Sequence, residues 1–138
     1  MLKRIAHVAI AVADLDRACE FWQDVMGARI ESRRVVAGQK VEVAFVSLNA
    51  GTRLELLAAT EDDSPVARYL AKHGPGLHHI CFEVDNIAER LKHLEEHGIK
   101  LVDRIPRAGA EDDQVAFLHP SSTLGALIEL SEGKTEQG

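Results

Sequence analysis

The sequence predicts an α+β fold in which two tandem βαβββ modules form a curved, mostly antiparallel, eight-stranded sheet. Two observations lead to this fold class: an internal repeat, and the alternation of apolar and polar residues within each half. The repeat is clearest when IAHVAIAVADLDRACEFWQDVMGARI is placed over LHHICFEVDNIAERLKHLEEHGIKL. At a constant offset of 72 residues (79 − 7), His7 falls on His79 and Phe45 falls on Phe117.

Each half reads as a strand, a helix and three further strands. The first helix is predicted to begin after an N-cap at Asp14 and to end at Gly27, and the second ends at Gly98. A short linker helix is expected between the halves, with Ser64 as its N-cap. The turn at 49–51 is expected to be a hairpin turn. The chain is thus predicted to be a single domain, residues 1–138, with module one at 4–58, linker helix at 64–74, module two at 77–131 and a polar tail at 132–138.

Composition excludes several classes of partner. A net charge of −6 argues against nucleic acid, because phosphate contacts need a basic surface. No apolar run is long enough to cross a membrane, and the alternating N-terminal segment has no cleavage site typical of a signal peptide. Cys19 and Cys81 are too few for a disulfide framework, which predicts reduced thiols in a cytoplasmic protein.

Strand periodicity selects four polar residues. In each half, one histidine and one glutamate are predicted to point away from the helix layer, into the space that the curved sheet surrounds. These residues occupy repeat-equivalent places in the two halves: His7, Glu55, His79 and Glu129. Two imidazoles and two carboxylates are a donor set for a divalent metal ion with coordination positions left for substrate, and Co, Mn, Ni, Zn or Mg would all be acceptable. The sequence therefore predicts a metal site enclosed by the sheet.

Two further polar residues need an interpretation. Glu42 is predicted to point inward with Ala44 and Val46, where a carboxylate could abstract a proton or could simply be a solvated residue at a strand end. Its repeat mate is the amide Gln114, so the two halves differ there. His78 has the opposite orientation to its neighbour His79, and we expect it to have a structural role.

The two modules with inward His and Glu residues resemble the vicinal oxygen chelate superfamily, which includes glyoxalases, bleomycin resistance proteins and dioxygenases. Within it, the chain is most similar to the methylmalonyl-CoA epimerase family. The similarity extends from about residue 4 to 131, and rests mainly on SPVARYLAKHGPGLHHICFEV and FLHPSSTLGALIEL. The chain departs from the family in the acidic stretch AGAEDDQ and at Ser121, where family members commonly carry lysine.

The resemblance implies a glyoxalase-like fold and a metal-dependent epimerase acting on an acyl-CoA. It implies that His7, Glu55, His79 and Glu129 hold the metal, that Glu42 is a catalytic base, and that Glu129 is the candidate for the second one. Abstraction of the α-proton from (2R)- or (2S)-methylmalonyl-CoA would give an enolate that the metal stabilises. The resemblance also implies a homodimer.

Three alternatives share this fold. A lactoylglutathione lyase of the glyoxalase I type would use the same ligand set on a glutathione hemithioacetal. A drug-binding protein of the bleomycin-resistance type has no need of metal ligands, so the four ligands and Glu42 argue against it. An extradiol dioxygenase typically uses two histidines and one carboxylate on iron, and a fourth ligand is unexpected there.

Overall fold

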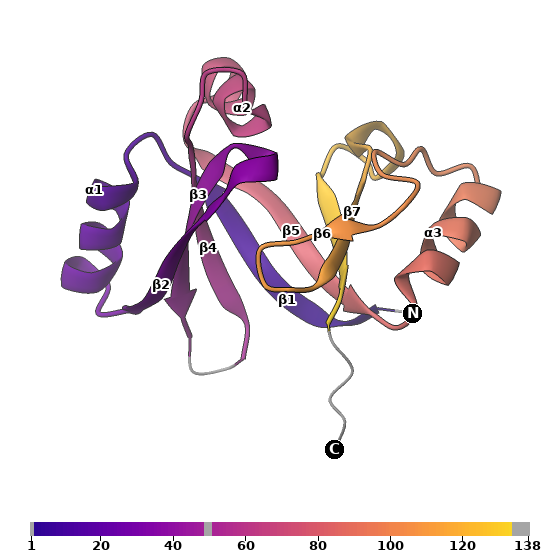
Figure 1. Cartoon of the computed structure of the whole chain (residues 1–138), viewed down its shortest axis with the longest axis horizontal. Helices are drawn as coiled ribbons and strands as arrows, with labels where there is room; N and C mark the ends of the chain where they lie inside the picture. Colours follow the sequence, from indigo (N-terminus) through magenta and orange to yellow (C-terminus); the bar gives the residue numbers. More distant parts are fainter. Residues whose placement is uncertain (1, 49–50, 134–138) are drawn as a thin grey trace. The chain divides into compact units, whose positions relative to one another are not determined.

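The computed structural model describes residues 2–48 and 51–133, so the expected turn at 49–51 lies mostly outside the described residues, as does the end of the tail (Figure 1). The chain divides into two compact units. The first unit is residues 7–78, and the second is made of the described parts of residues 1–6 and 79–138. Strand β1 (Leu2–Ala11) contributes residues to both units, because the division falls within it.

The first unit is a four-stranded sheet with helix α1 (Leu15–Glu20) against one face and helix α2 (Pro65–His73) next to β4 (Arg53–Ala59). Its strand order is β2-β3-β4-β1, with antiparallel β2/β3 and β3/β4 pairs and a parallel β1/β4 pair. Helix α1 packs against β3 (Val41–Ser47) and β4, while β2 (Arg29–Val36) is the edge strand. Burial of apolar side chains between helix and sheet stabilises this unit, and the buried members of that core are Leu15, Cys19, Ala44, Val46, Leu56 and Ala58.

The first helix begins after Asp14 and ends before Gly27, as predicted, but its last turn is not α-helical. The Asp14 carboxylate accepts a hydrogen bond of 3.1 Å from the Arg17 N–H, which satisfies one of the unpaired donors of the first turn. From Phe21 to Val25 the chain continues as a π-helical turn. This wider turn changes the helical register, and Val25 and Met26 are exposed.

Helix α2 (Pro65–His73) follows the first sheet and has the predicted boundaries. The fully buried Ser64 hydroxyl accepts a hydrogen bond of 2.9 Å from the Ala67 N–H, and Pro65 occupies the first helical position. The helix ends at Gly74, whose φ of 75° is one that few other residues adopt without strain. The Tyr69 hydroxyl donates a hydrogen bond of 2.5 Å to the Leu77 carbonyl, which fixes the start of β5 (Gly76–Val84) against α2.

The second unit repeats the arrangement of the first. Its strand order is β1-β5-β8-β7-β6, with a parallel β5/β8 pair and antiparallel β7/β8 and β6/β7 pairs. Helix α3 (Ile87–Glu96) packs against β7 (Gln114–Leu118) and β8 (Ile128–Glu132), and β6 is only the pair Arg107–Ala108. Its core contains the buried residues Val84, Ile87, Leu91, Ala116, Leu118 and Leu130.

Each unit therefore contains one βαβββ series, which is the predicted order: β1, α1, β2, β3, β4 and then β5, α3, β6, β7, β8. The predicted module limits stay a prediction, because the compact units divide the chain within β1 and β5. Neither of the two cysteines is in a disulfide. In the part of the chain that the structure describes, no helix has the length and apolar character needed to cross a membrane.

Candidate metal-binding residues

The first candidate pair is His7 with Glu55. Ile10 of β1 packs against the core with α1, as do Leu54 and Leu56 of β4, so alternation turns His7 and Glu55 to the opposite face. The parallel β1/β4 register pairs Ala9 with Glu55. His7 is two residues before Ala9 in β1 and therefore lies on the same face as Glu55. The His7 Nε2 lies 2.5 Å from the Glu55 carboxylate, and the two residues are only 5% and 4% exposed.

The second candidate pair is His79 with Glu129. Phe82 and Val84 of β5 face α3, and so do Ile128 and Leu130 of β8, which turns His79 and Glu129 to the other face. The His79 Nε2 lies 3.0 Å from the Glu129 Oε1, and the residues are 8% and 6% exposed. The edge of the Phe117 ring meets the His79 imidazole at a centroid distance of 5.2 Å, which restricts its rotation.

Both pairs have the donor chemistry of a divalent-ion site. Each supplies one imidazole nitrogen and one carboxylate oxygen from neighbouring parallel strands, and both side chains are more than nine-tenths buried. Burial of a carboxylate is costly unless a cation or hydrogen-bond donor compensates it. A divalent first-row ion takes this mixture of nitrogen and oxygen ligands. The residues that the sequence predicted as ligands thus fit such an ion, pair by pair.

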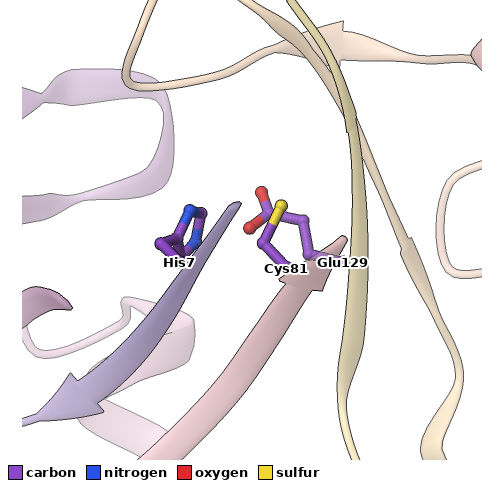
Figure 2. A group of neighbouring side chains, drawn as sticks. All are labelled: His7, Cys81 and Glu129. Atoms are coloured by element: carbon purple, nitrogen blue, oxygen red, sulfur yellow. The ribbon is translucent and has the colours of Figure 1, made fainter. Parts of the chain in front are cut away.

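Cys81 is a residue of this face that the sequence analysis did not assign to the site. It is fully buried and lies directly opposite Glu129 in the β5/β8 register. Figure 2 shows the Cys81 and Glu129 side chains next to each other. The Cys81 Sγ lies within 4.8 Å of a Glu129 carboxylate oxygen. The signal was available, since Cys81 is two residues after His79 and strand period two places both on one face.

Glu42 does not point where the sequence analysis expected. The antiparallel register pairs Phe45 with Glu55 and Glu42 with Ala58, and directly opposed residues share a face. Glu42 is therefore on the side of β3 that faces α1, together with Ala44 and Val46. The inward orientation predicted for Glu42 is wrong. The prediction placed Ala44 and Val46 on the inward face of β3, whereas α1 packs against these two residues and Glu42 shares their face.

An ion-pair cluster holds Glu42 on the α1 side. The Arg33 guanidinium is 3.3 Å from the Glu42 carboxylate and 2.5 Å from that of Asp16. Hydrogen bonds to Asp16 and then to Glu42 raise the pKa of Arg33. Burial raises the pKa of the neighbouring Cys19 thiol, and the Arg33 charge opposes that shift. The cluster connects β2 and β3 to α1, and as it stands it holds Glu42 away from the face that carries Glu55.

Two arginines lie over phenylalanine rings on the faces that carry the candidate ligands. The Arg53 guanidinium is 5.6 Å from the centroid of the Phe45 ring, and Arg107 is 5.5 Å from that of Phe117. Arg53 also pairs with Glu31 at 3.0 Å. Arg53 was missed although its position two residues before Glu55 gives both residues the same strand face.

Other predicted features have a definite place. The His78 ring meets Tyr69 of α2 edge-on at a centroid distance of 4.7 Å, as expected of a residue with a structural role. In the acidic stretch, the Gly109 N–H donates to the Asp113 carbonyl at 3.0 Å, which closes a turn. After β7, the Ser121 hydroxyl and N–H both contact the His119 Nδ1, at 2.7 and 3.1 Å.

Comparison with known proteins gives a consistent result. The profile of the Glyoxalase/Bleomycin resistance protein/Dioxygenase superfamily matches residues 6–117. The chain is 40% identical to the mitochondrial methylmalonyl-CoA epimerase of Bos taurus, over 95% of this chain and 75% of the relative. It is 37% identical to the ethylmalonyl-CoA/methylmalonyl-CoA epimerase of Cereibacter sphaeroides, over 96% of this chain and 99% of the relative.

A solved structure shows the same fold. It is a methylmalonyl-CoA epimerase in complex with methylmalonyl-CoA and NH4+, which is 32% identical to this chain. It superposes with a TM-score of 0.93 over 98% of this chain and 97% of the other. The predicted fold class, a glyoxalase-like arrangement of paired βαβββ modules, is confirmed.

Proposed function

The chain belongs to the glyoxalase/bleomycin resistance protein/dioxygenase superfamily, and from that premise we propose that it is an epimerase interconverting (2R)- and (2S)-methylmalonyl-CoA. The observation that carries the proposal is the agreement between site and relatives. Two buried His–Glu pairs stand at repeat-equivalent places in a chain that is 37 to 40% identical to epimerases over nearly its whole length. A lactoylglutathione lyase or a drug-binding protein is not favoured by these relatives.

We propose that His7, Glu55, His79 and Glu129 together hold one divalent ion. The support is the donor chemistry of each pair and the repeat, which gives each half one nitrogen and one oxygen ligand. A divalent ion bound there would supply Lewis-acid polarisation of the substrate's thioester carbonyl, which acidifies the α-carbon. The identity of the ion is left among Co, Mn, Ni, Zn and Mg, because the set offers imidazole nitrogens that suit the transition metals and carboxylate oxygens that also suit Mg²⁺.

Inversion requires a proton to leave one face of the α-carbon and another to arrive on the opposite face. We propose Glu129 for one of these transfers, because its carboxylate is buried and lies beside Cys81 and His79. If Glu129 is also a ligand, it must loosen from the ion when it carries the proton. Glu42 is proposed for the second transfer, and because it lies on the α1 side of β3 and pairs with Arg33, this role requires that ion pair to break and the backbone of β3 to rearrange.

The acyl-CoA substrate carries negative charge, and the two arginines are suited to it. We propose that Arg53 and Arg107, each held over a phenylalanine ring, orient anionic groups of the substrate. Arg53 is 40% exposed in its side chain and Arg107 is 44% exposed, so both can reach a ligand. A homodimer and a cytoplasmic location complete the proposal.

The test is α-proton exchange in deuterated water. The protein is stripped with a chelator, reconstituted with each candidate metal and given (2R)-methylmalonyl-CoA, and deuterium uptake and the 2S epimer are followed. We expect exchange with inversion that the chelator abolishes. Bound metal without exchange would contradict the proposed substrate while leaving the metal site intact, and the glutathione hemithioacetal would then be tested.

The role of Glu42 can be separated from a structural one. If Glu42 serves one face of the α-carbon, Glu42→Gln should lose exchange with one epimer and keep it with the other. The matched control is Glu83→Gln, since Glu83 is also a strand carboxylate paired with an arginine, Arg4, at 2.6 Å. An equal, small effect of both substitutions on both epimers would mean that Glu42 only ties β3 to α1.

A further inference from the structure

The end of helix α3 carries a pair of histidines that the epimerase chemistry does not use. Residues 93–97 read HLEEH, so His93 and His97 are four residues apart, with Glu96 between them. Both histidines are exposed, in contrast to the buried His7 and His79. Residues at positions i and i+4 of a helix lie one above the other on the same face, which is the spacing of helical zinc ligands.

The two rings are already side by side. Their centroids are 4.2 Å apart and their planes are inclined by 38°. Rings held this close by the backbone can turn their Nε2 atoms toward a common ion with small side-chain rotations.

The second observation concerns the tautomer of His97. Its Nδ1 lies 2.8 Å from the His93 carbonyl oxygen. A carbonyl oxygen only accepts, so the Nδ1 carries a proton, and in the neutral imidazole the Nε2 then has its lone pair available. A histidine that binds metal through Nε2 usually donates its Nδ1–H to a carbonyl or carboxylate in this way, because that bond fixes the ring orientation. The last turn of α3 therefore presents His97 in the state that a metal requires.

We propose that His93 and His97 form a second, surface site for a divalent transition-metal ion, separate from the proposed buried ligands. Imidazole donors favour Cu²⁺, then Ni²⁺, then Co²⁺, and bind Mn²⁺ weakly, with Zn²⁺ below Cu²⁺. Mg²⁺ is not held, since it prefers oxygen ligands in an octahedral arrangement. The remaining coordination positions are open to water, because the helix end is exposed. That exposure argues for ion binding rather than hydrolysis, since catalysis by such an ion needs a shaped and water-excluding cleft.

The test measures Ni²⁺ binding by equilibrium dialysis of the full chain and of His93→Gln and His97→Gln. Glutamine is as good a helix former as histidine, and both positions are exposed, so folding should be unaffected. The buried ligands are present in all variants, so their contribution cancels in the difference. We expect each substitution to remove one bound Ni²⁺ per chain, with the double variant losing no more, because a chelate needs both rings.

His73→Gln is the matched control, since His73 is also an exposed histidine near a helix end whose ring lies against an aromatic ring, Tyr69, at 4.8 Å. It should keep the wild-type amount of Ni²⁺.

With Mg²⁺, wild type and all variants should bind the same amount of metal. In the wild type, the Cu²⁺ that binds beyond the amount held by the proposed buried ligands should show two nitrogen ligands in its electron paramagnetic resonance spectrum, and the single variants should lack this additional signal. Unchanged Ni²⁺ binding in either histidine variant would overturn the proposal, as would an equal loss in His73→Gln. Neither result bears on the proposed epimerase, which the exchange experiment tests separately.

Discussion

The two units build the same polar pair from neighbours that differ. In the first unit His7 is 2.5 Å from Glu55, and in the second His79 is 3.0 Å from Glu129, each on parallel adjacent strands with the helix on the other face. The residue two places after the histidine is Ala9 in one unit and Cys81 in the other. The two units thus share the histidine and glutamate that would bind a metal. The residues next to these two pairs differ between the units.

The arginines show the same contrast. Both units place a guanidinium over the repeat-equivalent rings Phe45 and Phe117, at 5.6 and 5.5 Å. The first arginine, Arg53, comes from β4 beside Glu55, whereas the second, Arg107, comes from the short strand β6. A methylmalonyl thioester is not symmetric, so a site that inverts it needs unlike groups around a symmetric set of ligands. The differences between the units are where those groups should be found.

The largest effect is expected from the histidines of the two pairs. His7→Ala and His79→Ala each remove a proposed ligand, and we expect metal affinity to fall by more than about a hundredfold, because changes to outer-shell partners alone cost 10–100-fold. Metal content after dialysis, measured by mass spectrometry, checks this. His78→Ala is the control, since His78 contacts Tyr69, and it should keep its metal. Equal metal content in His78→Ala and His79→Ala would sink the assignment, and loss in only one of the two ligand variants would show that the units do not contribute equally.

The next effect compares the two cores. Leu56 is fully buried under α1, and Leu91 of α3 is 2% exposed in the second core. Each Leu→Ala change leaves a cavity, and we expect each to lower the free energy of unfolding by about 2–5 kcal/mol. Urea denaturation followed by circular dichroism measures this. Leu77→Ala is the control, because Leu77 is 69% exposed and should change stability by no more than about 0.5 kcal/mol. A loss confined to one of the two core variants would show that the units are not energetically equivalent.

The polar pairs could be predicted from the sequence because two periodicities agree on them. Strand period two fixes the face of His7 and Glu55 once Leu54 and Leu56 are recognised as core, and the 72-residue offset repeats the argument for His79. Glu42 could not be placed in this way. Val43 and Phe45 are as apolar as Ala44 and Val46, so both faces of β3 read as buried, and only the register with β4 decides between them.

The contacts that depend on three dimensions were also out of reach. The Arg33 cluster joins residues of β2, β3 and α1 whose separations carry no periodic signal. The π-helical turn at Phe21–Val25 arises in the segment FWQDV, whose apolar residues fit an ordinary α-helix equally well, so the exposure of Val25 was not predictable. Helix starts were predictable, because Asp14 and Ser64 act through local hydrogen bonds.

The helix N-caps give a third comparison. Asp14 caps α1 from an extended conformation, whereas Asn86 caps α3 with a φ of 49°, in the left-handed region. Asp14→Ala should cost about 1 kcal/mol through the lost cap. Asn86→Ala should cost more, about 1–2 kcal/mol, because alanine also tolerates the left-handed conformation poorly. Thermal unfolding measures both. Asn86→Gly separates the causes, since glycine accepts that φ, and a loss as large as that of Asn86→Ala would contradict the conformational explanation.

The smallest effect concerns the turns before β3 and β7. Lys40 and Asp112 are repeat-equivalent (112 − 40 = 72), and both are left-handed, with φ of 55° and 57°. Glycine relieves the strain of the left-handed backbone but loses more conformational entropy on folding, and the two effects partly cancel. Asp112→Gly should therefore stabilise the protein by about 0.5 kcal/mol in urea denaturation. Lys40→Gly should gain less, because Lys40 also pairs with Asp63 at 2.5 Å. An equal gain at both positions at neutral pH would mean that this exposed ion pair contributes nothing.

The pH dependence of Lys40→Gly tests the same ion pair from another direction. The hydrogen bond from Lys40 holds the pKa of the Asp63 carboxyl below its ordinary value. A carboxyl whose pKa is lowered by folding contributes stability above its ordinary pKa, and that contribution is lost as the pH falls through the folded value. The wild type should therefore lose this contribution in acid, whereas the Lys40→Gly variant has none to lose. The gain from Lys40→Gly should accordingly increase as the pH is lowered, and a gain that stays constant from neutral to acid pH would mean that the Asp63 pKa does not depend on Lys40.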